Sequence, residues 1–295
     1  MPNPFVILTD DFCDLPSDYI AKHPLTVMPT EYTVDGTTYS NDTASSQYLA
    51  LPDFYAKLRA GSIAKTSALS MEAIKNAMEV PLKNGYDVLY IAFSSALSGT
   101  YNNGRLAKEE LRTAYPNRKI FVVDSLSASL GQGLLVHYAL TLQAQGRSIE
   151  SVTEELECDK QKFCHYFTVD DLHFLHRGGR VSKATAVVGS MLGIKPVLHV
   201  NSEGKLIPIG KVRGRKQSLQ ALVDKMAQKI GNNKNDVVYI SHGDCEEDAV
   251  YVAGLVKKKF GIKSFLINYV GATIGAHSGP GTVALFFIGN NRTES

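Results

Sequence analysis

At 295 residues, with 44% hydrophobic and 20% charged residues, the chain is long enough for two domains with buried cores. Its net charge is only +2, which excludes a protein held to nucleic acid or to an anionic membrane by its overall field. No apolar stretch reaches the ~18 residues of a membrane span. Residues 1–11 lack the basic region of a signal peptide, and the four cysteines show no C-x-x-C spacing. We therefore expect a cytoplasmic protein with reduced thiols.

The first half of the chain alternates short apolar strands with helical patterns. The patterns predict strands at 5–9, 87–93 and 119–123, and helices at 16–22, 52–59, 70–83, 100–113 and 129–145. Ser70 and Ser148 are expected to be N-caps, and Pro81 should stop or kink its helix. This repetition indicates a parallel sheet covered by helices, in which ligands bind at the carboxyl ends of the strands.

The pattern changes after about Cys158. We predict an antiparallel hairpin of 195–200 with 205–212, strands at 164–169, 236–241, 263–270 and 282–288, and helices at 216–230 and 246–260. The fold class is therefore α/β, with a parallel-sheet domain at 1–157 packed on a mixed α/β domain at 158–295.

The segment from Phe93 to Tyr101, Phe-Ser-Ser-Ala-Leu-Ser-Gly-Thr-Tyr, gathers hydroxyl groups between an expected strand and an expected helix. The first turn of a helix exposes unpaired N–H groups and a partial positive charge, so a carboxylate or phosphate can bind there without lysine or arginine. The plain alternative is an N-cap with a tight turn.

Two further segments could meet this loop. Residues 65–70 form a second hydroxyl cluster before a helix, although such a run is often only a cap. Residues 274–282 place His277 in an expected loop of small residues, where it could donate to an anionic group and, if protonated, add charge. A lone histidine in a loop can equally be structural.

Arg177-Gly178-Gly179-Arg180 precedes an uncharged stretch at 184–194. Core burial is the ordinary explanation of that stretch. The sharper hypothesis is that four of its side chains line a cavity for an alkyl tail, namely Val187, Val188, Met191 and Leu192.

Residues 211–216 form a compact basic patch that could dock an acidic partner or simply begin a solvated helix. The sequence has no G-x-x-x-x-G-K-[ST], G-x-G-x-x-G, G-x-S-x-G or H-E-x-x-H motif. We expect no cofactor and no metal site, because neither ATP, NAD nor zinc has a motif to support it.

Taken together, these segments resemble the DegV family of fatty-acid-binding proteins, which present acyl chains to a bacterial fatty acid kinase. The resemblance runs along nearly the whole chain, and its ordered motifs are Thr9-Asp10, Thr66-Ser67, Ser94 to Tyr101, Asp124-Ser125, Gly178-Gly179-Arg180, the basic patch and His277 to Gly281. Ala68 and Leu69 stand where members often carry proline. We therefore expect the stiffness of the loop after Ser67 to differ from the family pattern.

The resemblance implies a carrier with no catalytic residue of its own and a long-chain fatty acid, such as palmitate or oleate, as its ligand. It places Thr66, Ser67 and Ser95 on the carboxylate, with the Ala96 N–H nearby. Arg180 and His277 would lie by the head group, and Arg213 would face the kinase. Burying the tail would gain about 0.8 kcal/mol per CH₂, while an unpaired carboxylate would cost several.

Two other functions fit the same loops. A serine hydrolase or acyltransferase would use Ser95 as nucleophile and His277 as base, with Asp10 or Asp124 orienting the histidine. A regulatory module would instead bind a phosphorylated metabolite there, and the uncharged stretch would serve only as core.

Overall fold

The computed structural model describes residues 4–182 and 193–293. Its first sheet has the strand order β2-β1-β6-β7 and is parallel throughout, which confirms the expected parallel sheet. The strands are β1 (Phe5–Asp10), β2 (Leu25–Met28), β6 (Asp87–Ala92) and β7 (Ile120–Asp124). Every residue of β6 is buried, as the near-continuous apolar run predicts for a central parallel strand.

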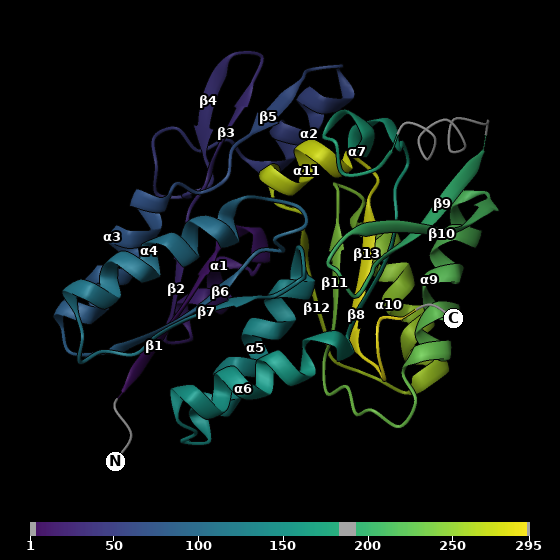
Figure 1. Cartoon of the computed structure of the whole chain (residues 1–295). Coiled ribbons are helices and arrows are strands. Elements are labelled where there is room, and N and C mark those ends of the chain that lie inside the picture. Colours follow the sequence, from purple (N-terminus) through teal and green to yellow (C-terminus); the bar gives the residue numbers. More distant parts are fainter. Residues whose placement is uncertain (1–3, 183–192, 294–295) are drawn as a thin grey trace.

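Helices cover both faces of this sheet (Figure 1). On one face lie α3 (Met71–Lys83) and α4 (Thr100–Ala114), and on the other α5 (Leu130–Ala144) and α6 (Ile149–Asp159), while the short α1 (Ser17–Ala21) packs beside β2. Ser70 and Ser148 cap α3 and α6 as predicted, each accepting a backbone N–H. Pro81 lies inside α3, which ends two residues later at Lys83.

The second sheet has six strands in the order β10-β9-β8-β13-β11-β12. They are β8 (Phe163–Thr168), β9 (Ile194–Val200), β10 (Leu206–Arg213), β11 (Val238–His242), β12 (Phe265–Tyr269) and β13 (Val283–Ile288). Only the β11–β12 pair is parallel, so the sheet is mixed as expected, and the predicted β9–β10 hairpin is antiparallel. Its outer face is covered by α9 (Arg215–Lys229) and α10 (Glu246–Phe260).

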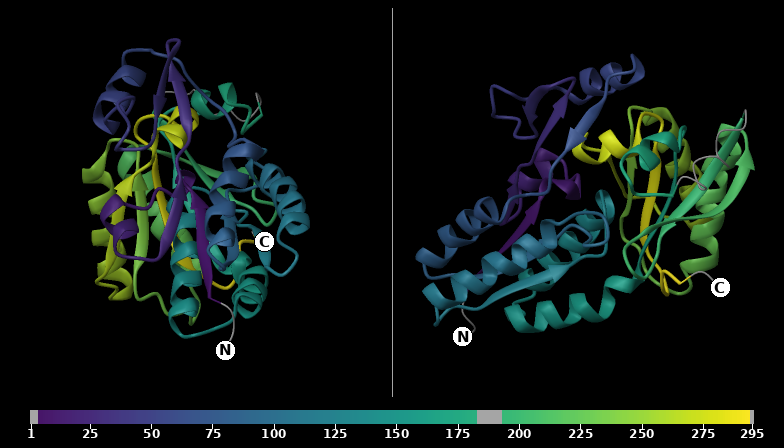
Figure 2. Two further views of the ribbon diagram at one scale, coloured as in Figure 1. Left: turned by 90° about the vertical axis from the view of Figure 1, so that its left-hand side faces the viewer. Right: turned by 45° about the horizontal axis from the view of Figure 1, so that its top comes forward.

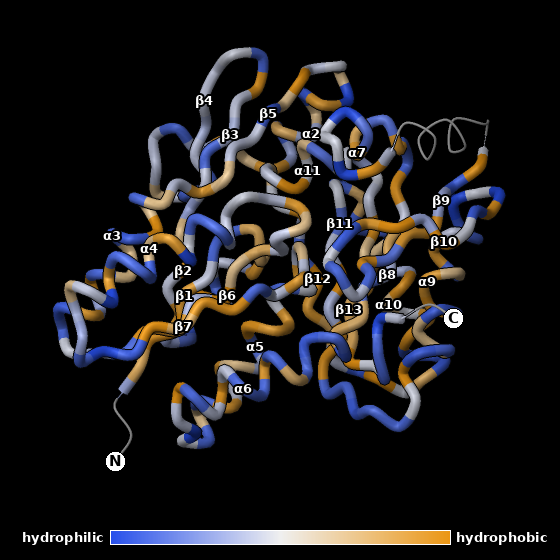
Figure 3. The backbone as a smooth tube through the Cα atoms, in the orientation of Figure 1, coloured by the Kyte–Doolittle hydropathy of each residue, from blue (hydrophilic) through white to orange (hydrophobic). Residues whose placement is uncertain are grey.

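Helix α5 lies between the two large sheets and contacts both (Figures 1 and 2). Ten of its 15 residues are buried and none is charged, as expected for a helix that is covered on all sides. Figure 3 shows hydrophobic residues along the strands of both sheets and mainly hydrophilic residues in the outer loops. The principal core therefore runs through α5 from one sheet to the other.

A third sheet, β4-β3-β5, was not expected from the sequence. Its strands are β3 (Glu31–Val34), β4 (Thr37–Ser40) and β5 (Ala64–Thr66), all paired antiparallel. They are short and half exposed, so they carry no clear period-2 pattern. With α2 (Leu51–Arg59), this sheet packs on α11 (Ala272–Ser278), which in turn contacts α7 (His173–Arg177).

Helix α11 corrects one expectation, because the residues around His277 were predicted to form a loop. The helix forms despite three glycines nearby because it is clamped between the small sheet and α7, and tertiary packing overrides weak local propensity. Two 3₁₀ turns complete the fold, at Asp11–Cys13 and Lys160–Lys162. The domain boundary between residues 157 and 158 stays a prediction.

Candidate functional site

An internal cavity lies between the inner face of the six-stranded sheet, the loop after β6 and helix α11. Its lining is mostly apolar and comes from both halves of the chain, including Phe12, Phe93, Leu97, Phe167, Leu175, Val200, Leu206, Val270, Ile274, Ala284 and Phe286. The space open to the centre of a water molecule is about 120 Å³, roughly ten times what one buried water needs.

The lining of the cavity follows the strands of the six-stranded sheet for several residues. Phe167, Ala284 and Ser241 form one row across β8, β13 and β11, and His165 and Phe286 form the next row. From Thr282 to Phe286 the lining follows four residues of extended chain, or about 13 Å at ~3.3 Å per residue. The lining is therefore long enough to follow part of an extended alkyl chain.

Two of the predicted head-group residues meet at one end of the cavity. Thr66 Oγ1, from β5, and His277 Nε2, from α11, are 2.7 Å apart in a hydrogen bond. Burial, with smaller effects of the Arg180 and Arg177 charges, lowers the pKa of His277 from 6.5 to about 4. At neutral pH the imidazole is therefore uncharged, and the positive charge considered for it in the sequence analysis is absent.

The charge at this end comes from Arg180. Its guanidinium donates to the carbonyl oxygen of Leu97 at 2.8 Å and to that of Gly178. Burial lowers the pKa of Arg180 from 12.5, but a guanidinium stays protonated at neutral pH. Among the described residues no carboxylate forms an ion pair with Arg180. A half-buried cation with no acidic partner among the described residues thus lines the same cavity as Thr66 and His277.

The loop after β6 reaches the cavity through residues other than those expected. Leu97 and Ser98 are in the lining, whereas Ser95 and Ala96 are exposed and outside it. The Ala96 N–H donates to Ser94 Oγ at 3.3 Å, and the Ser95 N–H to Asp124 Oδ1 at 3.1 Å. The expected backbone donor, the Ala96 N–H, is therefore already paired, and a role of Ser95 or Ala96 on a ligand stays a prediction.

The remaining predicted residues fall in three places. Ser67 lies next to Thr66 and lines the cavity, although much of it is exposed. Arg213 is exposed at the end of β10, away from the cavity lining. The four residues expected to line the alkyl pocket, Val187, Val188, Met191 and Leu192, lie outside the described residues.

Sequence reasoning missed four polar residues that line the same cavity, namely Ser129, His165, Ser241 and Thr273. Most are single serines or threonines without a pattern. His165 carried a signal that could have been used, because it is a polar residue in the middle of the mainly apolar strand Phe-Cys-His-Tyr-Phe-Thr.

Glycine is required at positions 178 and 179 for two different reasons. A Cβ at Gly178 would lie 2.2 Å from His277 Nδ1, whereas Gly179 has open space but a positive φ of 74°. We expect Gly178→Ala to displace the imidazole and break its bond to Thr66. Any anionic ligand at this end should then bind severalfold more weakly, as measured by calorimetry.

Gly179→Ala is the matched control, because it adds the same methyl group into free space and costs only about 1 kcal/mol of backbone strain. Equal binding loss in both variants would show that backbone strain, and not the position of His277, controls the site.

The arrangement does not support the serine hydrolase alternative. His277 Nε2 bonds Thr66, while Ser95 is exposed. The two acids considered as third members are bound elsewhere: Asp10 accepts from Gln132, Tyr90 and the Phe93 N–H, and Asp124 accepts from the Ser95 and Leu126 N–H groups. A Ser–His–Asp relay is therefore not assembled around His277 in the described part of the chain.

Comparison with known proteins places these features in a family. The sequence model described as "Uncharacterised protein, DegV family" matches residues 4–290. The chain belongs to the DegV family. A DegV domain-containing protein of Clostridium perfringens is 42% identical, with 98% of each chain covered. A protein of Thermotoga maritima named "Fatty acid-binding protein" is 33% identical, covering 94% of this chain and 95% of that protein.

The family fold is also seen in a solved structure. The Streptococcus pneumoniae Fatty Acid Kinase B3 protein loaded with linoleic acid superposes with a TM-score of 0.84 at 23% identity, covering 97% of this chain and all of the other. That likeness shows a common DegV fold. Within residues 4–182 and 193–293, none of the helices has the length and apolar character that a bilayer-crossing segment requires.

Proposed function

We propose that this DegV protein carries one long-chain fatty acid, with the alkyl tail in the internal cavity and the carboxylate at Thr66, Ser67 and Arg180. The observation that carries the proposal is Arg180: a cation without an acidic partner among the described residues lines a mostly apolar cavity that follows several residues of extended strand. The fatty-acid-binding relative from Thermotoga maritima supports the same ligand class.

The energetics favour such a ligand. Burial of alkyl carbons gains about 0.8 kcal/mol per CH₂, so a tail of a dozen or more carbons outweighs the cost of ordering it. The carboxylate would cost several kcal/mol if it were buried unpaired. Arg180 offsets that cost with a charge-assisted hydrogen bond.

Neutral His277 has a positioning role in this proposal. If Nε2 carries the imidazole proton, it donates to Thr66 Oγ1, and the hydroxyl proton of Thr66 is then free to point at the carboxylate. The protein makes and breaks no bond itself.

Identification of the bound molecule tests the proposal directly. Protein purified from an expression host, then denatured and extracted, should release a long-chain fatty acid in near-stoichiometric amount by mass spectrometry. A protein that releases no fatty acid and binds neither palmitate nor oleate by calorimetry would rule the carrier out.

Removing the Thr66 hydroxyl should weaken binding without changing the shape of the side chain. We expect Thr66→Val to raise the Kd for oleate about tenfold, since a hydrogen bond to a charged group contributes roughly 1.5–3 kcal/mol. Thr113→Val, at an exposed position on α4, is the control and should bind like the parent protein. Unchanged affinity of the Thr66 variant would place the carboxylate elsewhere.

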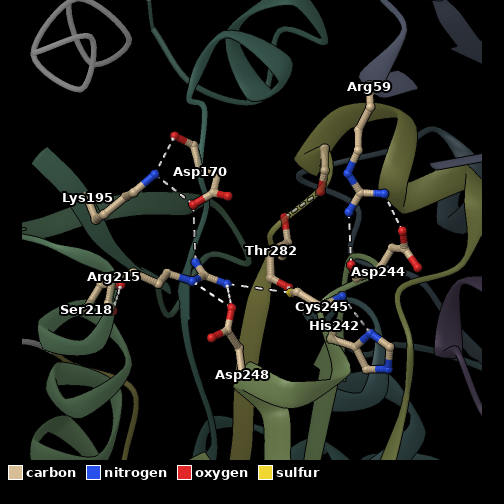
Figure 4. A network of polar contacts seen from close by, with 11 residues as sticks. Arg59, Asp170, Lys195, Arg215, Ser218, His242, Asp244, Cys245, Asp248 and Thr282 are labelled. Carbon is tan, nitrogen blue, oxygen red and sulfur yellow. Dashed lines mark hydrogen bonds and ion pairs between the residues drawn. The ribbon is translucent and has the colours of Figure 1, made fainter. Parts of the chain in front are cut away.

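The further step, presentation of the carboxylate to a fatty acid kinase, is proposed for the basic patch. Within it, Arg215 is occupied by ion pairs with Asp248 at 2.7 Å and Asp170 at 3.4 Å (Figure 4). Arg213 is exposed and makes no ion pair with a described residue, so it is available to an acidic partner.

We expect Arg213→Ala to keep oleate affinity and to lower the rate of acyl phosphate formation when the protein is combined with a fatty acid kinase. Arg112→Ala, another exposed arginine but on α4, is the charge-matched control. Loss of oleate binding in the Arg213 variant would contradict a role confined to the partner surface.

A further inference from the structure

His165 is a buried polar side chain in the lining of the cavity. It lies on β8 with 2% of its surface exposed, and among the described residues neither ring nitrogen makes a hydrogen bond of normal geometry, although the backbone of Gly131 acts on the ring as a weak partner. An unpaired buried donor or acceptor costs ~1–3 kcal/mol, so such groups are rare without a function or a bound partner.

The ring is held in place by its neighbours. A Cβ at Gly131 of α5 would lie 2.1–2.2 Å from two atoms of the imidazole, and Phe286 packs edge-on to it with ring centroids 5.4 Å apart. Gly131 therefore leaves the space that the ring occupies, and the ring cannot swing toward another partner on the α5 side.

His165 is too deep in the cavity to serve the carboxylate. The head-group end is built by elements that follow β8 and precede β13, namely α7, Arg180 and α11. His165 lies three residues before the end of β8, and its neighbour Phe286 lies three residues after the start of β13. Both are therefore about 10 Å from these strand ends at ~3.3 Å per residue. Phe167 and Ala284 line the row between.

The imidazole can both donate and accept. Burial, with a smaller effect of the Arg292 charge, lowers its pKa well below 6.5, so at neutral pH one nitrogen carries a proton and the other offers a lone pair. A saturated alkyl chain beside it offers a partner to neither. A hydroxyl group can satisfy either one, because it donates and accepts.

We propose that the cavity prefers acyl chains with a hydroxyl group along the chain, and that His165 is the residue that recognises it. The inference rests on the proposed fatty acid carrier function and names the class of acyl chain. Pairing the hydroxyl with His165 removes the desolvation cost that the same hydroxyl would meet in a wholly apolar pocket.

A positional series tests this preference. Octadecanoic acid and hydroxyoctadecanoic acids with the hydroxyl at successive carbons compete for the full-length protein, and bound chains are quantified by mass spectrometry. We expect one narrow range of positions, away from both chain ends, to bind about tenfold more tightly than octadecanoic acid. Equal binding of plain and hydroxylated chains at every position would overturn the proposal and leave the carrier function intact.

Two variants assign the effect to His165. His165→Leu should bind plain and hydroxylated chains equally well and so lose the preference, whereas His165→Asn, which retains a donor and an acceptor, should keep part of it. A preference unchanged in His165→Leu would overturn the assignment. If His165→Leu does not fold, the positional series and His165→Asn still test whether His165 recognises the hydroxyl group. Absence of binding by every acid would instead refute the carrier function itself.

Discussion

Replacing Arg292 with alanine is expected to lower the free energy of unfolding by roughly 3–5 kcal/mol, because several buried acceptors would lose their donor at ~1–3 kcal/mol each. The side chain is 1% exposed. Its guanidinium donates to the carbonyl oxygens of Phe163 at 2.6 Å, Lys160 at 2.9 Å and Leu126, and to Ser127 Oγ at 2.8 Å. It therefore ties the C-terminal segment to the start of β8 and to the loop after β7.

Urea unfolding followed by circular dichroism measures the loss. Arg147→Ala is the control, because that arginine is partly exposed and pairs with Glu155 at the surface, where an ion pair contributes less than about 1 kcal/mol. A difference below 1 kcal/mol between the two variants would mean that water replaces the guanidinium without cost.

The same contacts connect Arg292 to the ligand site. The loop that it holds includes Ser127, whose carbonyl oxygen accepts the N–H of Ser94, at the start of the segment that brings Leu97 and Ser98 to the cavity. Arg292 itself does not line the cavity. A loss of fatty acid affinity in Arg292→Ala is therefore expected to follow the loss of stability.

The sequence predicted those parts of the fold whose signals are local and repeated. Helix α5 was placed within one residue because its apolar run is long and Gly146 ends it, and the Ser70 and Ser148 caps were identified from their chemistry. The small sheet and α11 were missed because their residues are short runs that become ordered only by packing on one another.

In the site, too, the sequence predicted the residues that have a local pattern and missed those that depend on tertiary packing. The hydroxyl and His-Gly motifs indicated where an anion could bind, but no local pattern places Thr66 beside His277, 211 residues away. No local pattern marks Arg292 as a buried residue, since the acceptors it satisfies come from residues 126–163. Burial of an isolated polar residue is decided by tertiary structure, which explains why His165 was also overlooked.

Asp14→Asn is expected to reduce the pH dependence of stability by about 2 kcal/mol between pH 6.5 and 8, at ~1.4 kcal/mol per unit. Burial raises the pKa of Asp14 from 3.8 to about 8. Between these values the folded protein holds a proton that the unfolded chain has released. The free energy of unfolding therefore falls as pH rises through this window, and an amide that does not titrate removes that slope.

Asparagine fits the contacts of the protonated acid. Asp14 Oδ1 accepts the Gly271 N–H at 3.0 Å and Oδ2 bonds Ser129 Oγ, so an asparagine can accept with its oxygen and donate with its nitrogen. The φ of 51° at this position also suits asparagine. Stability at pH 6.5 should therefore change little.

Urea unfolding at pH 6.5, 7.25 and 8 gives the slope. Histidines with lowered pKa values oppose this slope up to about pH 7.5, one unit above the unfolded pKa, but they are the same in both proteins, so the difference between the two slopes reports Asp14. Asp10→Asn is a contrasting variant. Asp10 accepts hydrogen bonds from Gln132, Tyr90 and the Phe93 N–H, so the NH₂ group of an asparagine at this position would face donors and destabilise the protein at every pH. A slope in Asp14→Asn as steep as in the parent would show that Asp14 is ionised throughout this range.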